Sequence, residues 1–81
     1  MTQRERRRQR ITNNPRNVRP EELEALLLEA GFLRRGGKGD HVVFTKGQTA
    51  LSIDYRRPYL LAVYVRSALK AIEKEGTDGE A

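Results

Sequence analysis

The amino-acid sequence predicts a small α+β fold with the order helix, three strands, helix, in which a three-stranded antiparallel sheet carries both helices on one face. Three patterns support this prediction. Apolar residues recur at helical spacing within residues 20–30 and again within residues 64–74. Between these two segments, residues 41–45 and 49–53 follow the two-residue period of strands that are buried on one side.

The first helix is expected at residues 20–30. Pro20 suits the first helical position, where no backbone N–H is needed, and Glu21 and Glu22 favour the positive end of the helix dipole. Gly31 lies where a left-handed residue commonly ends a helix. One apolar stripe of this helix consists of Leu23, Leu26, Leu27 and Ala30.

Strands are expected at residues 32–35, 41–45 and 49–53. A glycine-rich loop at residues 36–40 joins the first two as an antiparallel hairpin, and a tight turn at residues 46–48 joins the next two.

The second helix is expected to cover most of residues 64–74, with a start that the sequence leaves open because no good N-cap residue precedes it. Packing both helices on one face of the sheet predicts a shared core. Its expected members are Leu26, Leu27, Val42, Phe44, Leu69 and Ile72.

The chain length of 81 residues predicts one domain, at residues 14–75, with a core near the lower limit for independent folding. Five arginines within residues 1–13 have the composition of a flexible basic arm. Residues 76–81 have the composition of a disordered polar tail. The apolar runs are too short to span a bilayer, and we expect a cytoplasmic protein.

The composition limits the chemistry. The chain has no cysteine and one histidine, which excludes a disulfide framework, a thiolate zinc site and an imidazole cluster. We therefore expect any catalysis to need no metal and no cofactor. The net charge of +5 favours polyanionic partners.

His41 begins the best predicted strand, next to the glycine-rich loop. Because successive strand residues point to opposite faces, His41, Val43 and Thr45 should lie on the exposed face and Val42 and Phe44 on the helix side. A histidine fixed there beside a basic loop suits proton transfer or phosphate contact. Alternatively, His41 is an ordinary surface histidine.

Cations near His41 are candidates for contacts with a phosphate backbone. Lys38 and the backbone of Gly39 lie in the loop, where Lys38 is otherwise a solvated lysine. The other candidates are Arg34, Arg35, Arg56 and Arg57. Tyr55 and Tyr59 can stack on bases, whereas Tyr64 lies close to the helical stripe and is expected to pack.

Residues 14–73 resemble HicA-type toxins, the RNA-cleaving members of toxin–antitoxin pairs. The resemblance rests on the lead-in at residues 14–18, on the segment Gly-Lys-Gly-Asp-His-Val-Val-Phe at residues 37–44, and on Tyr64-Val65-Arg66 with Leu69 and Ile72. It implies a double-stranded-RNA-binding-domain-like fold, mRNA cleavage that depends on His41, and a HicB-type antitoxin as partner. Two positions depart from the family pattern, which usually has serine where this chain has Asp40 and often a second histidine where it has Val42.

Two functions from different classes follow. The first is a metal-independent endoribonuclease toxin that an antitoxin neutralises by covering His41. The second is a non-catalytic RNA-binding or partner-binding module of the same fold, which the negative charge of Asp40 favours.

Overall fold

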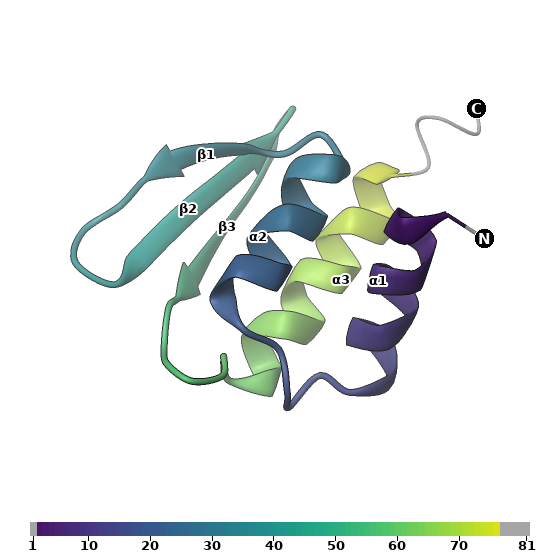
Figure 1. Cartoon of the computed structure of the whole chain (residues 1–81). Coiled ribbons are helices and arrows are strands. Elements are labelled where there is room, and N and C mark those ends of the chain that lie inside the picture. Colours follow the sequence, from purple (N-terminus) through teal and green to yellow (C-terminus); the bar gives the residue numbers. More distant parts are fainter. Residues whose placement is uncertain (1, 77–81) are drawn as a thin grey trace.

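A computed structural model describes residues 2–76, which fold into three helices and one three-stranded sheet (Figure 1). The elements are α1 (Gln3–Asn13), α2 (Pro20–Glu29), β1 (Leu33–Gly36), β2 (His41–Lys46), β3 (Thr49–Asp54) and α3 (Ala62–Gly76). The predicted α+β class and its three-stranded sheet are confirmed, and every predicted strand or helix lies within a few residues of its observed bounds.

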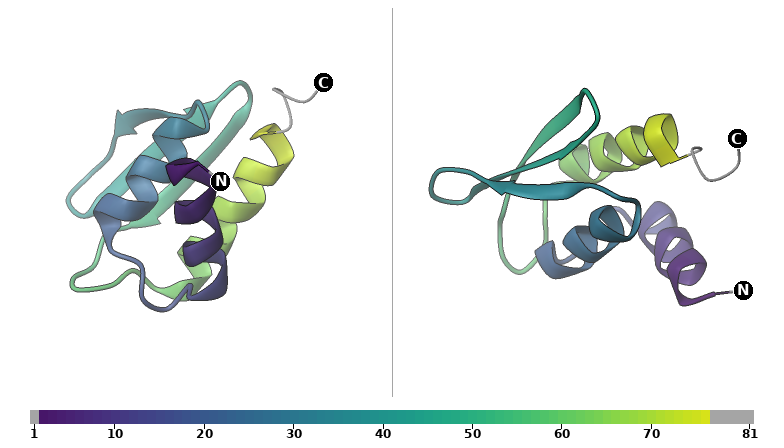
Figure 2. Two further views of the ribbon diagram at one scale, coloured as in Figure 1. Left: turned by 45° about the vertical axis from the view of Figure 1, so that its right-hand side comes forward. Right: turned by 90° about the horizontal axis from the view of Figure 1, so that it is seen from above.

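The sheet is antiparallel with the strand order β1-β2-β3. Gly47 and Gln48 form a two-residue turn between β2 and β3, which places Lys46 opposite Thr49 and continues in register to His41 opposite Asp54. The pairing of β1 with β2 is irregular between Arg34 and Gly36. Helices α2 and α3 cover one face of the sheet and leave the other face open (Figure 2).

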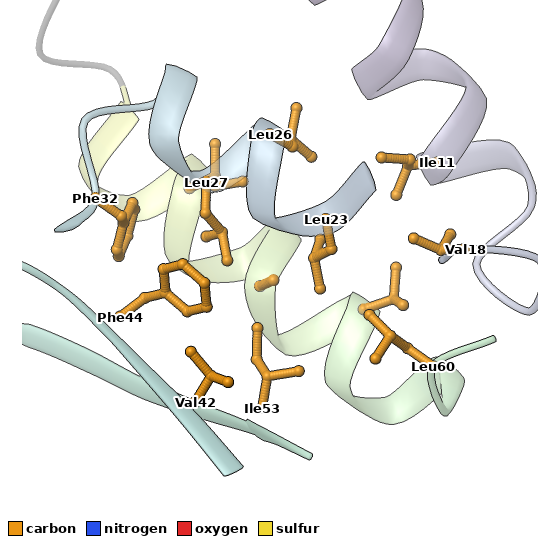
Figure 3. Packing of buried hydrophobic residues seen from close by; sticks show 13 residues of the cluster. Ile11, Val18, Leu23, Leu26, Leu27, Phe32, Val42, Phe44, Ile53 and Leu60 are labelled. Carbon is orange, nitrogen blue, oxygen red and sulfur yellow. The ribbon is translucent and has the colours of Figure 1, made fainter. Parts of the chain in front are cut away.

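The core lies between the covered face of the sheet and these helices (Figure 3). Val42, Phe44 and Ile53 project from the sheet toward the helices. Of the predicted core residues, Leu26, Leu27, Val42, Phe44 and Ile72 are buried, and Leu69 is partly buried against them. Ile11, Val18, Phe32 and Leu60 are also buried, although they were not among the predicted core residues.

The prediction of a flexible basic arm at residues 1–13 is wrong for the described residues, because residues 3–13 form α1. A capping box starts this helix: the Glu5 N–H donates to the Thr2 hydroxyl (3.1 Å), and the Thr2 N–H donates to the Glu5 carboxylate (2.9 Å). Ile11 is fully buried in the core. Arg7 and Arg10 form ion pairs with α2, to Glu29 and Glu22 respectively.

Helix α3 begins at Ala62, two residues before the predicted segment, and ends at Gly76. Gly76 is therefore helical rather than part of a disordered tail, and residues 77–81 of the predicted tail lie outside the described residues. Leu60, just before α3, is buried, and its N–H donates to the Val18 carbonyl (2.8 Å). Among residues 2–76, no helix has the length and apolar character needed to cross a membrane.

Candidate functional site around His41

His41 lies on the open face of the sheet, as the two-residue period predicts. Its neighbour Val42 is buried on the helix side, whereas His41 is exposed. The His41 N–H donates to the Lys38 carbonyl (3.0 Å), so a tight turn leads directly into β2. The imidazole is thus held on a regular strand while remaining accessible to a large ligand.

The glycine-rich loop at residues 36–40 packs its backbone closely against that of His41. A Cβ atom on Gly37 would lie 1.9 Å from the His41 carbonyl oxygen, so only glycine fits without a shift of the loop. Gly39 has a φ of 58° in the turn before His41, a conformation that favours glycine. Lys38 lies between these two glycines and is exposed. On the opposite side, the Tyr55 N–H donates to the Asp40 carbonyl (2.8 Å) and extends the β2–β3 pairing beyond His41.

Asp54 lies directly opposite His41 in the pairing of β2 with β3. Directly opposite residues of an antiparallel pair share a face, with Cβ atoms about 4.5–5.5 Å apart. Asp54 therefore shares the open face with His41, as its direct neighbour across the two strands. Asp40, the other nearby acid, directly precedes His41 in the chain. Because successive residues of an extended chain alternate, its side chain is directed toward the helix side of the sheet. Asp54 was not among the predicted site residues.

The predicted phosphate-binding cations divide into two groups. Arg34 forms an ion pair with Glu24 of α2 (3.2 Å), and Arg57 forms one with Glu21 of α2. Within the part of the chain that the structure describes, Arg35, Lys38 and Arg56 have no ion-pair partner, and all three are exposed. The structure therefore leaves Arg35, Lys38 and Arg56 available near the loop, while acidic side chains of α2 already neutralise Arg34 and Arg57.

Tyr55 joins the loop to α2. Its hydroxyl donates to Glu24 (2.7 Å), and the guanidinium of Arg34 lies 5.9 Å from the centre of its ring. Burial and the hydrogen bond to Glu24 both raise the pKa of the Tyr55 hydroxyl, so it remains a neutral donor at physiological pH. Tyr55 is thus part of a structural network, while Tyr59 is exposed and Tyr64 packs against the core as predicted.

Residues 2–76 contain no group of three or more histidine, cysteine, aspartate or glutamate side chains that could hold a metal ion. The chemistry available at this site is that of one imidazole, one facing carboxylate, a loop with exposed backbone and three unpaired cations. Such a set can transfer a proton and bind a phosphodiester.

Comparison with known proteins gives no assignment. No protein-family model matches the chain, and neither the search of curated proteins nor that of solved structures finds a significant match.

Proposed function

We propose that the protein is a metal-independent endoribonuclease, the mRNA-cleaving toxin of a toxin–antitoxin pair, with His41 as the general acid or base. The observation that carries the proposal is the position of His41: exposed on an open sheet face, at the end of a close-packed glycine loop, and opposite Asp54. The resemblance of residues 14–73 to HicA-type toxins points to the same residue and to a double-stranded-RNA-binding-domain-like fold.

In the proposed mechanism, His41 accepts the proton of an RNA 2′-hydroxyl as its oxygen attacks the neighbouring phosphorus. The leaving 5′-oxygen takes a proton from the imidazolium or from water, which leaves a 2′,3′-cyclic phosphate and a 5′-hydroxyl. Asp54 holds the imidazolium by charge. Lys38 and the N–H groups of the loop stabilise the negative charge that develops on the phosphate oxygens.

Substrate binding follows from the unpaired cations. Arg35 and Lys38 lie at the end of β1 and in the following loop, and Arg56 follows β3; in this proposal their exposed side chains contact the phosphate backbone, which gives affinity without sequence preference. A HicB-type antitoxin would neutralise the toxin by covering the open sheet face, and both would act in the cytoplasm, where mRNA is available.

His41→Ala, assayed on purified RNA in the presence of EDTA, tests the proposal. The parent should cleave RNA to cyclic-phosphate ends without added metal, and the variant should lose at least about a hundredfold in rate. Ser52→Ala is the matched control, because Ser52 lies opposite Val43 on the same sheet face and has no acid–base role. Cleavage by the His41→Ala protein at close to the parental rate would refute the assignment.

The non-catalytic RNA-binding or partner-binding module remains the second candidate. Two observations favour it: Asp40 adds negative charge directly before His41 in the chain, and Arg34 and Arg57 are already paired with α2. Expression in a bacterial host separates the two. A toxin arrests growth and loses this effect with His41→Ala, whereas a binding module gives the same growth with either protein.

A further inference from the structure

We propose that α1 and α3 together form a second surface for the phosphate backbone of nucleic acid, on the far side of the molecule from His41. This proposal concerns binding alone and does not depend on cleavage at His41. It rests on the positions of five cations on two neighbouring helices, on their lack of acidic partners, and on the near absence of apolar residues between them.

The first part of this surface is a stripe of three cations along α3. Arg66, Lys70 and Lys74 are spaced four residues apart and are all exposed. Residues at this spacing lie on one face of a helix, about 6 Å apart along its axis. The buried side of α3 carries Val65 and Ala68, so the stripe faces away from the core.

The second part is one flank of α1. Arg4 and Arg8 are exposed and lie one turn apart. Viewed down the axis of α1, buried Ile11 separates two pairs of arginines. Arg7 and Arg10 lie on one side of Ile11 and form ion pairs with α2, and Arg4 and Arg8 lie on its other side. Arg4 and Arg8 therefore occupy the flank nearer α3. Helices α1 and α3 contact each other, and the start of α1 and the end of α3 lie toward the same end of the helical layer (Figure 1).

The five cations of this helical basic face have no ion-pair partner within residues 2–76. The face consists of Arg4, Arg8, Arg66, Lys70 and Lys74, and the exposed acids beside it are Glu5 on α1 and Glu73 on α3. This contrasts with Arg7 and Arg10, whose charges are neutralised by α2. Its positive charge is thus available to a ligand.

The chemistry of the face favours a polyphosphate over a protein partner. Protein interfaces depend on a desolvated core of aromatic and apolar anchors, surrounded by a polar rim. Along the α3 stripe, the exposed large apolar residue is Val63, which is too little for such a core. Flexible lysine and arginine side chains in a row instead suit the evenly spaced charges of a nucleic acid strand, and this contact carries no sequence preference.

The two nucleic acid surfaces lie on opposite sides of the molecule. In Figures 1 and 2, the β1–β2 loop next to His41 projects at one side, and α1 lies at the other. The helical basic face therefore cannot position a phosphate at His41. Its role is to raise the affinity for RNA and to hold a strand that continues beyond the site.

The test measures RNA binding by the full-length His41→Ala protein, so that the RNA stays intact. Lys70→Gln/Lys74→Gln in that background removes two cations from the helical basic face. We expect the slope of log affinity against log salt to become shallower by about 1.4 for single-stranded RNA. If the two proteins bind equally at 1 M salt, this is a loss of about 25-fold in affinity at 0.1 M salt. Amide shifts on RNA addition should include residues 66–74.

Arg16→Gln/Arg19→Gln is the matched control. This double variant also removes two positive charges, but they lie in the loop between α1 and α2, at the opposite end of the helices from the end of α3 (Figure 1). It should leave the slope of log affinity against log salt nearly unchanged. Equal effects of the two double variants would overturn the proposal, because net charge alone would then explain binding. RNA-induced shifts confined to residues 36–41 would also overturn it. A third result would also overturn it: poly-glutamate binds with the same affinity as RNA and changes the amide shifts of residues 66–74. This would indicate an acidic protein partner.

Discussion

At the scale of single residues, the site depends on which side of β2 each charge occupies. His41 and Asp54 share the open face, whereas Asp40 belongs to the other side and lines a shallow hollow with Tyr55, Arg56 and Arg57. Both aspartates are direct neighbours of His41, Asp40 along the chain and Asp54 across the sheet. For the proposed RNA cleavage, these different faces predict different roles: Asp54 would act on the imidazole, and Asp40 would act on the approaching phosphate.

Substitution of the two aspartates distinguishes these roles. Asp54→Asn should lower kcat about tenfold because the imidazolium loses its facing carboxylate. Asp40→Asn should leave kcat within about threefold and lower KM, because it removes a charge that repels phosphate. Single-turnover and steady-state cleavage of a short RNA measure both constants. Asp54→Glu should recover part of kcat, and equal losses from Asp54→Asn and Asp40→Asn would contradict the assignment.

The sequence alone predicts the face of His41, because strand alternation is a local property. The position of Asp54 could also have been predicted from the sequence. A two-residue turn at Gly47-Gln48 pairs Lys46 with Thr49, and the same register continued along both strands pairs His41 with Asp54. The ion pairs of Arg34 and Arg57 were not predictable, because they depend on where α2 lies relative to the sheet. No pattern in the chain encodes that position directly.

At the scale of elements, the loop between β1 and β2 determines how His41 enters its strand. Gly36 and Gly37 are consecutive but differ in their surroundings. A Cβ atom at Gly36 meets no other atom within 4 Å, although its φ of 93° disfavours other residues. A Cβ atom at Gly37 would instead collide with the His41 backbone.

Gly37→Ala should therefore be the more damaging of two similar changes. Gly36→Ala should cost about 1–2 kcal/mol of unfolding free energy for its left-handed backbone. Gly37→Ala should cost about 2 kcal/mol more, or displace the loop, because the added methyl group overlaps a main-chain oxygen. Urea unfolding gives the energies, and the amide shifts of His41 and Val42 report the displacement. Equal stabilities with unchanged His41 and Val42 shifts in both variants would show that the close contact does not exist.

Helix α1 shows why composition misled the prediction for the first 13 residues. Its arginine content is typical of a solvated segment, but the positions of the residues matter more than their number. Thr2 and Glu5 have the spacing of a capping box, a signal present in the sequence. The decisive contacts are tertiary, since Ile11 packs into the core and Arg7 and Arg10 reach the acids of α2.

At the scale of the whole molecule, charge is arranged in layers. Acidic α2 is flanked by cations from both directions: Arg7 and Arg10 of α1 on one side, and Arg34 and Arg57 from the sheet side on the other. The excess positive charge is thus displaced to the two outer sides, at the β1–β2 loop and on the helical basic face. A chain with a net charge of only +5 can in this way present two separate cationic surfaces.

This arrangement makes the attachment of α1 sensitive to acid. Burial raises the pKa of Glu22, but the hydrogen bond from the Arg19 N–H (2.9 Å) and the ion pair with Arg10 lower it more, so its pKa lies below the ordinary 4.5. A carboxyl with a lowered pKa stabilises the fold above its ordinary pKa and loses this contribution as pH falls through the lowered value. The unfolding free energy should therefore decrease as the pH falls below about 4.5.

Glu22→Ala should lower the unfolding free energy at pH 7 by about 1 kcal/mol, because it removes a helix-capping acceptor and an ion pair. The difference between parent and variant should shrink as the pH falls through the lowered pKa of Glu22, because the parent carboxylate then becomes protonated and loses its ion pair. Glu21→Ala is the control, since Glu21 also pairs with an arginine but at a more exposed position that does not involve α1. Urea unfolding between pH 3 and 7, followed by the amide shifts of residues 3–13, measures both the energy and the release of α1. A Glu22→Ala protein that keeps the full acid dependence of the parent would show that this carboxylate does not link α1 to α2.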